Sequence, residues 1–235
     1  MKISNSESFS AKEEKPKRKP LAKLDYFHGY LAKEALFTGD WDIPYIESAG
    51  IVPNKVITFS KCLKSKDYEC WVVFYEDDTA FERFWKKPER YLPILRKFSG
   101  VVCPDFSLYG DYPLCIQLFN VYRSRVIGHW LSQNGIRIIP NVRWSTHHTY
   151  SFCFEGLKQN DILFVGSHGC SKRLDDREIF SKGLMEMVNR LKPTTICVYG
   201  KVSNPVFKEL LELGISVVPF DSEFSLSQEV INQWD

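Results

Sequence analysis

The feature that most constrains this fold is a repeat of short apolar runs, each followed by a polar turn and then by a longer helical segment. Strand-sized runs that alternate with helices are typical of parallel βαβ units. The predicted strands are residues 56–59, 71–75, 101–103, 137–140, 162–165, 195–199 and 216–220. The predicted helices between them include residues 79–85, 113–133, 178–191 and 205–213. We therefore expect an α/β protein with a predominantly parallel sheet.

The number of strands bears on whether this sheet is closed or open. Several of the runs are apolar on both faces, which predicts helices on both sides of the sheet. Seven runs are present, and residues 152–154 are a candidate for an eighth. This count of about seven or eight favours a β/α-barrel-like arrangement, and the alternative is an open doubly wound sheet.

The N-terminal region differs from the rest of the chain. Residues 1–20 are rich in Ser, Glu, Lys and Pro, contain the basic run KPKRKP, and hold too few apolar side chains to offset the entropy of ordering. We predict that they form a disordered basic tail. Residues 21–47 have apolar side chains at mixed helical spacing, which predicts an amphipathic helix. Residues 21–235 are expected to form a single α/β domain.

Charge and cysteine content narrow the class of protein. The 31 basic and 29 acidic residues give a net charge of +2, which argues against a body that coats nucleic acid non-specifically. The seven cysteines show no CxxC spacing, and no signal peptide is recognised, which favours free thiols in the cytoplasm. No apolar run reaches about 18 residues, so no membrane span is expected.

Candidate site residues follow the predicted strands, because ligand sites of α/β proteins collect at the carboxyl ends of parallel strands. Asp105 is the candidate general base, and loop capping is the alternative role for it. Arg143 is a candidate for binding phosphate or carboxylate, or for an ion pair with Asp105 or Asp111. The other candidate ligand-binding residues in these loops are Ser107, Tyr109, Asn141, Trp144, Ser167 and Gly169.

The long predicted helix adds a polar stripe to this set. Gln117, Asn120 and Ser124 recur at steps of three or four, beside Arg123 and Arg125, in an otherwise apolar segment. Gln117, Asn120 and Arg123 are candidate ligand-binding residues if this stripe faces the strand ends, and the stripe is a solvated face if it does not.

Several well-defined motifs are missing from the sequence. The spacings GxxxxGK[ST], GxGxxG and GxSxG do not occur, so a P-loop, a dinucleotide fingerprint and a nucleophile elbow are not expected. His147, His148, His168 and Cys170 lack the spacing of a metal site. We predict no metal and no cofactor.

Four stretches carry a family resemblance. They are FYEDDTAFERFWKKPERYL, then GVVCPDFSLYGDYPLCIQLFNVYRSRVIGHWL, and then GIRIIPNVRW with FVGSHG. Together they resemble the domain-of-unknown-function family 4417, from about Leu31 to Asp221. The motif positions here are Asp105, Ser107, Tyr109, Pro113, Gln117, Asn120, Arg123, Arg125, Asn141, Arg143 and Trp144. The resemblance implies a protein of phages and other mobile elements, and it implies no particular reaction.

These observations leave three functional hypotheses and do not decide whether the protein is an enzyme. The first is a pocket that binds or acts on a nucleotide or nucleic-acid component, with Arg143 and Arg123 on phosphate, Trp144 or Tyr109 stacking, and Asp105 handling a proton. The second is a non-catalytic protein that sequesters a host nucleotide signal or holds a host protein. The third is an accessory of DNA replication or transfer in which the basic tail provides affinity.

Overall fold

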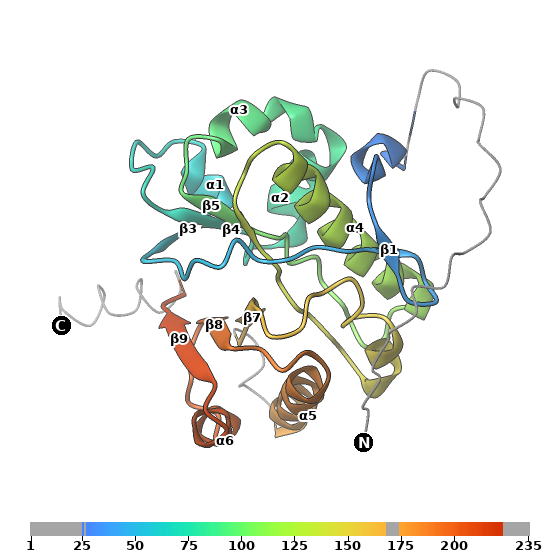
Figure 1. Cartoon of the computed structure of the whole chain (residues 1–235), viewed down its shortest axis with the longest axis vertical. Helices are drawn as coiled ribbons and strands as arrows, with labels where there is room; N and C mark the ends of the chain where they lie inside the picture. The colour runs from blue at the N-terminus through green and yellow to red at the C-terminus, as the bar shows by residue number, and fades with distance from the viewer. Residues whose placement is uncertain (1–24, 26, 168–173, 223–235) are drawn as a thin grey trace, which may run out of the picture.

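The computed structural model describes residues 25, 27–167 and 174–222 of the chain. The predicted basic tail, residues 1–20, lies outside this part. The described residues form mixed α/β structure with two parallel sheets and a small antiparallel pair (Figure 1). In the described part, no helix has the length and apolar character needed to cross a membrane.

The parallel strands follow one another in space in the order in which they occur in the chain. A four-stranded sheet has the order β3-β4-β5-β6, and a three-stranded sheet has the order β7-β8-β9. The bounds are β3 Val56–Thr58, β4 Trp71–Val73, β5 Gly100–Val102, β6 Ile138–Ile139, β7 Ile162–Gly166, β8 Thr195–Tyr199 and β9 Ser216–Phe220. All neighbouring strands pair in parallel, as the sequence predicted.

The two sheets meet at β6 and β7. An isolated parallel bridge joins Asn141 to Phe164, the Phe164 amide donates to Pro140, and the Val142 amide donates to Phe164. Side chains from all seven strands contribute to one apolar cluster between the sheets. The members of this cluster and the side chains packed against it are Val56, Trp71, Val73, Tyr75, Val102, Ile139, Ile162, Phe164, Cys197, Tyr199, Val218 and Phe220.

The expectation of a barrel with seven or eight strands is only partly met. Strands β3 and β9 are the outer strands of their sheets, and in the described part they do not pair with each other. The candidate eighth strand, residues 152–154, is wrong, because this segment forms turns after a 3-10 helix, η3 His147–Ser151. Its aromatic side chains are buried instead, since Phe154 packs against Tyr150 of η3 and against Trp144 in the loop after β6.

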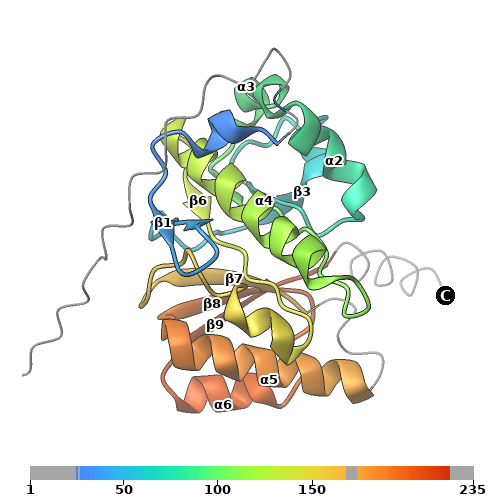
Figure 2. The same ribbon diagram turned by 90° about the vertical axis from the view of Figure 1, so that its right-hand side faces the viewer.

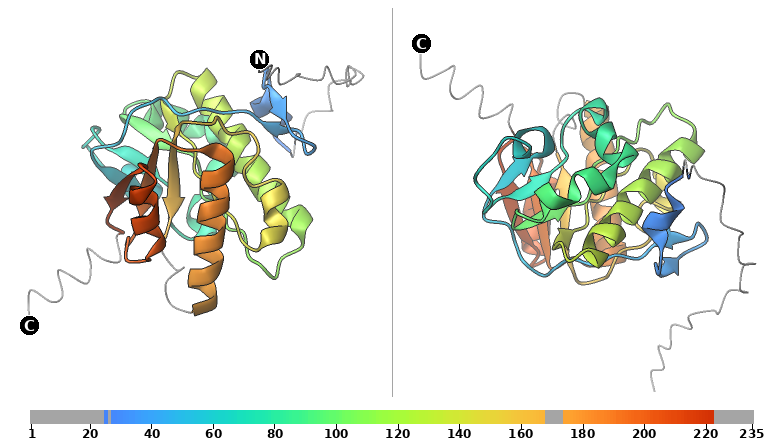
Figure 3. Two further views of the ribbon diagram at one scale, coloured as in Figure 1. Left: turned by 60° about the horizontal axis from the view of Figure 1, so that its bottom comes forward. Right: turned by 90° about the horizontal axis from the view of Figure 1, so that it is seen from above.

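Helices cover the outer faces of both sheets. In Figure 2, α4 crosses in front of the four-stranded sheet, and α5 and α6 lie below the three-stranded sheet. Figure 3 gives two further views of these layers. The bounds are α1 Phe59–Cys62, α2 Asp78–Lys86, α3 Leu92–Leu95, α4 Leu114–Gln133, α5 Leu174–Leu191 and α6 Val206–Glu212. A further 3-10 helix, η2 Pro88–Arg90, lies between α2 and α3.

The N-terminal helix predicted for residues 21–47 is wrong where the structure describes it. This stretch contains a short 3-10 helix, η1 Gly29–Ala32, and an antiparallel pair, β1 Phe37–Thr38 with β2 Ile43–Pro44. The apolar side chains of this stretch do not lie on one face of a helix, because Ile43 is buried in the core whereas Leu36 is 69% exposed. Gly39 and Asp42 have positive φ angles, which fit the turn between the two strands and not a helix.

Candidate functional site

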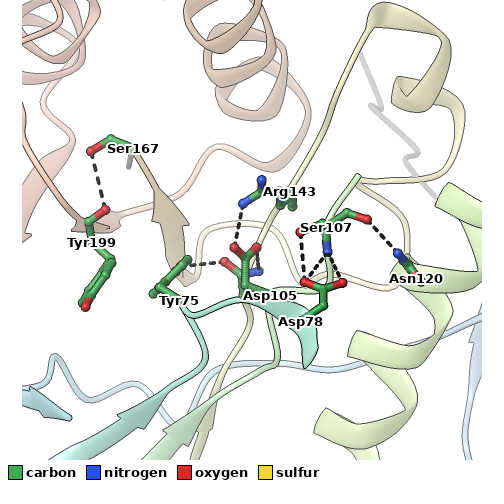
Figure 4. Close-up of polar contacts among 9 residues, drawn as sticks. Tyr75, Asp78, Asp105, Ser107, Asn120, Arg143, Ser167 and Tyr199 are labelled. Atoms are coloured by element: carbon green, nitrogen blue, oxygen red, sulfur yellow. Dashed lines mark hydrogen bonds and ion pairs between the residues drawn. The ribbon is translucent and has the colours of Figure 1, made fainter. Parts of the chain in front are cut away.

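The carboxyl ends of β4, β5 and β6 bring four polar side chains into one hydrogen-bonded network, because parallel neighbours end at the same edge of a sheet. Asp105 follows β5, and Asn141 and Arg143 follow β6. The Asn141 side-chain amide donates to Asp105 Oδ1 at 2.8 Å, and Arg143 Nη1 donates to Asp105 Oδ2 at 2.6 Å (Figure 4). Tyr75, after β4, completes the network by donating its hydroxyl to Asn141 Oδ1 at 2.6 Å.

Burial controls the electrostatics of this network. Asp105 is only 7% exposed, and burial raises the pKa of its carboxyl, while the Arg143 charge and the Asn141 hydrogen bond lower it. Burial also raises the pKa of Tyr75 well above its usual value, and the nearby Asp105 carboxylate raises it further. Tyr75 therefore stays a neutral hydrogen-bond donor. Both carboxylate oxygens of Asp105 accept hydrogen bonds, so this side chain is placed to position Asn141 and Arg143.

A second network fixes the loop after β5. The carboxylate of Asp78, the first residue of α2, accepts hydrogen bonds from the Ser107 amide (3.1 Å) and the Ser107 hydroxyl (2.9 Å) (Figure 4). The side chain of Asn120, on α4, donates to the Ser107 carbonyl oxygen at 2.6 Å. Helices α2 and α4 therefore hold this loop from two sides.

The polar stripe of α4 faces the protein, and its members are bonded to other protein groups. Arg123 donates to Asn120 at 2.7 Å and to Glu82 at 2.9 Å, and its guanidinium lies 3.8 Å from the centre of the Phe106 ring. Gln117 is 1% exposed and links the Tyr112 carbonyl to the Ser145 hydroxyl. These contacts fasten the loops at the strand ends to the helix.

Arg125 is a residue of the resemblance motif that the structure buries completely. Its guanidinium donates to the backbone carbonyls of Asn141 (2.8 Å), Cys153 (3.0 Å) and Glu155 (3.3 Å). Burial lowers its pKa to about 10, so it remains charged at neutral pH. Arg125 thereby fixes the backbone that leads from β6 to Arg143.

A cavity of about 340 Å³ opens beside this network, on the side of α5. Arg143 lines it and keeps a side chain 31% exposed, although it is paired with Asp105. Tyr109 stands at its rim, 50% exposed, with its ring 5.0 Å from that of Tyr112. Trp144 forms a wall with Phe180, and its indole N–H donates to the Ile179 carbonyl at 3.3 Å. Of the sequence candidates, this cavity therefore brings together Tyr109, Arg143 and Trp144.

A neighbouring cavity of about 270 Å³ lies at the carboxyl ends of β7 and β8. The two cavities share Phe180, and Gly166 lines the first while Ser167 lines the second. The Ser167 hydroxyl donates to the Lys201 carbonyl at 2.8 Å and so joins the end of β7 to the loop after β8. Figure 4 shows Ser167 next to Tyr199, away from Asp105. Gly169, the other candidate in this loop, lies outside the described residues.

The sequence candidates thus divide into two groups. The first group lines the two cavities: Tyr109, Arg143 and Trp144 line the cavity of about 340 Å³, and Ser167 lines the cavity of about 270 Å³. The second group is bonded in the networks beside the cavities and consists of Asp105, Ser107, Gln117, Asn120, Arg123 and Asn141. Sequence reasoning missed Tyr75, Asp78, Arg177 and Lys201 as contributors. Tyr75 and Lys201 had a usable signal, because Tyr75 ends a predicted strand and Lys201 follows one, whereas Asp78 and Arg177 are ordinary charged residues of helix first turns.

Among the residues that the structure describes, no group of three or more His, Cys, Asp and Glu side chains is placed to hold a metal ion.

The fold and the cavities define the class: an α/β protein with a polar cleft at the carboxyl edge of its parallel strands. The chain belongs to the family described as Domain of unknown function (DUF4417), whose model matches residues 35–221. This confirms the family resemblance inferred from the sequence motifs.

Two phage proteins are similar to the chain. The Gene 1 protein of Mycobacterium phage L5 is 37% identical over 166 residues, which are 69% of this chain and 72% of that protein. The Gene 1 protein of Mycobacterium phage D29 is 36% identical over 129 residues, which are 55% of this chain and 48% of that protein. No solved structure matches the chain. The protein is therefore of a phage type.

Proposed function

We propose that the cavity beside Arg143 binds a nucleotide or a nucleic-acid component. The observation that carries this proposal is the combination, in one cavity of about 340 Å³, of an arginine with an exposed tyrosine ring at the rim. A guanidinium recognises phosphate through paired N–H donors, and an aromatic ring stacks on a base. The volume is within the range of small-molecule sites.

Tyr109 is the better candidate for stacking. Its ring is half exposed, whereas Trp144 packs on Phe154 and Phe180 and uses its indole N–H on the Ile179 carbonyl. Trp144 would form the fixed wall of the pocket, and Tyr109 would cover the ligand from the rim. The aromatic group of a ligand would then lie between a rigid face and an adaptable one.

Asp105 would hold Arg143 in place without itself accepting a proton from the ligand. One carboxylate oxygen accepts from Arg143 and the other from Asn141, and the group is almost fully buried. A general base needs access to the proton that it removes. The proposed function is therefore a binding protein in which Asp105, Asn141 and Tyr75 position the arginine, and a role for Asp105 in catalysis is the alternative.

The strand arrangement supports the same placement. Seven parallel strands in chain order around a shared apolar cluster correspond to a barrel-like arrangement that is open between β9 and β3, and we propose this relation to β/α barrels as the reason that the loops converge. That residues 21–235 form a single domain, and that the protein is cytoplasmic, stay predictions.

The test is a titration of the full chain with the four common ribonucleosides and their 5′-monophosphates, followed by calorimetry. We expect a monophosphate to bind, and Tyr109→Ala to weaken it about tenfold. The matched control is Tyr68→Ala, which removes another part-exposed tyrosine, 39% exposed, before β4. A second pair compares Arg143→Gln with Arg137→Gln, because Arg137 is an exposed arginine at the opposite end of β6.

The two pairs of variants give clear outcomes. Loss of affinity in Tyr109→Ala and Arg143→Gln, with wild-type affinity in both controls, supports the proposal. Binding that is equal in all four variants, or no binding of any member of the panel, contradicts it. Chromatography of the ligand after incubation separates the two roles of Asp105: an unchanged ligand supports a binding protein, and a converted ligand supports catalysis.

A further inference from the structure

We infer that the second cavity, at the ends of β7 and β8, is a subsite for an anionic phosphate group, so that the ligand is a nucleotide with at least two phosphates. This inference rests on the proposed function and extends it from a ligand class to a narrower one. The second cavity has a volume of about 270 Å³ and is lined by Ser167, Arg177, Phe180, Lys201, Ser203, Asn204 and Pro205.

The charge of this lining favours an anion. Arg177, in the first turns of α5, and Lys201, after β8, are brought to the same cavity from residues far apart in the sequence. Among the described residues that line it, none is acidic, and Asp176 lines the neighbouring cavity instead. Two cationic side chains on the lining of one cavity make it a favourable place for an anionic group.

The walls of this subsite are held together before any ligand binds. The Ser167 hydroxyl donates to the Lys201 carbonyl at 2.8 Å, which sets the start of the loop that carries Lys201. On the opposite side, Asn204 Oδ1 accepts from the Val206 amide (3.1 Å) and from the Ser181 hydroxyl of α5 (3.2 Å). When a ligand binds to a preformed cavity, less free energy is lost in ordering the loops and side chains around it.

The position of this subsite sets the length of the ligand. The cavity beside Arg143 and the subsite share Phe180 and are lined by the consecutive residues Gly166 and Ser167. A base stacked on Tyr109 with a phosphate at Arg143 would reach Arg177 and Lys201 only through a further phosphate. A nucleoside diphosphate or triphosphate therefore fits the pair of cavities better than a monophosphate does.

The test uses the full chain and two double variants of equal charge. Arg177→Ala with Lys201→Ala removes both cations of the subsite. The control, Lys182→Ala with Lys208→Ala, removes two cations from α5 and α6 that pair with Glu178 and Glu212 at the surface. All four substituted side chains belong to exposed residues or surface ion pairs, so both variants are expected to fold.

The probes are inorganic pyrophosphate, a nucleoside 5′-monophosphate and the matching 5′-diphosphate, measured by calorimetry. We expect the subsite variant to lose at least tenfold in affinity for the diphosphate and for pyrophosphate, and less than twofold for the monophosphate, with the control variant like wild type. Equal loss in both double variants, or pyrophosphate binding that is absent or unchanged in the subsite variant, overturns the inference. If the monophosphate fails to bind while pyrophosphate binds as described, the proposed function fails and the anion subsite stands.

Discussion

The two sheets use their carboxyl ends in different ways. After β5 and β6, the polar side chains are bonded to one another: Asp105 holds Arg143 and Asn141, and Ser107 is held by Asp78 and Asn120. After β7 and β8, the Ser167 hydroxyl joins the end of β7 to the loop after β8, and Arg177 and Lys201 line a cavity. Polar residues at a strand end are thus not equivalent: some are bonded into a network that fixes the loops, whereas others line a cavity.

The strands of the two sheets also differ, because those of the three-stranded sheet are longer. Strands β7, β8 and β9 each contain five residues and pair along their whole length, whereas β3 to β6 contain two or three residues each. Short strands make few ladder hydrogen bonds, so the four-stranded sheet depends more on side-chain networks at its ends. Two substitutions and one pH dependence would test this difference, in order of decreasing effect on stability.

The largest effect is expected from removing the centre of the Asp105 network. Asp105→Ala leaves Arg143 and Asn141 without their shared acceptor in a mostly buried site, and we expect the free energy of unfolding to fall by about 3 kcal/mol. Urea denaturation measures the loss, and amide hydrogen exchange should accelerate at β5 and β6 more than at β8. The control is Asp111→Ala, at an exposed carboxylate nearby. A loss equal to that of the control would mean that the network contributes nothing to stability.

A smaller effect on stability is expected where helix α5 packs against Trp144, in the loop after β6. A Cβ atom on Gly183 of α5 would lie 2.0 Å from the indole nitrogen of Trp144, so Gly183→Ala must displace the wall of the first cavity. We expect a net loss of about 2 kcal/mol, although alanine is the better helix former, together with a changed tryptophan fluorescence spectrum. Lys182→Ala, at the exposed neighbouring position, is the control. A variant more stable than wild type would show that the loop after β6 adapts freely.

The smallest effect is a dependence on pH. Burial raises the pKa of Asp105, so its contribution to stability is fully present below the unfolded pKa of about 4 and is lost as the pH rises through the folded value. The free energy of unfolding of wild type should therefore decline relative to Asp105→Asn as the pH increases above about 4. Parallel pH profiles, or a decline towards acid pH, would show that pairing with Arg143 outweighs burial.

Much of the fold was open to prediction because its signals are local. Helix α4 was expected at 113–133 and occurs at Leu114–Gln133, and the seven parallel strands were each placed within a few residues. Prediction failed before Ile43, where apolar side chains are shared between the core and the surface, and at residues 152–154, where buried aromatic side chains belong to turns and form no strand. In both places, the burial of a residue depends on elements that are distant in the sequence.

The candidate site was predicted less well, for a related reason. The position of Arg143 after a strand, and its ion pair with Asp105 as one of two readings, followed from the alternation of strands and loops. The roles of Gln117, Asn120 and Arg123 did not, because a polar stripe looks the same whether it faces water, a ligand or neighbouring loops. Tyr75 escaped notice because a tyrosine at a strand end is usual in a core.

By itself, the sequence determined the parallel α/β class, the order of elements and the family, since hydrophobic periodicity and motif residues are properties of short segments. Only the tertiary structure decided which polar groups bond to one another and which line a cavity. Side chains after different strands meet only when the strands lie in register at one edge, and hydrogen bonds formed there determine which donors and acceptors remain for a ligand.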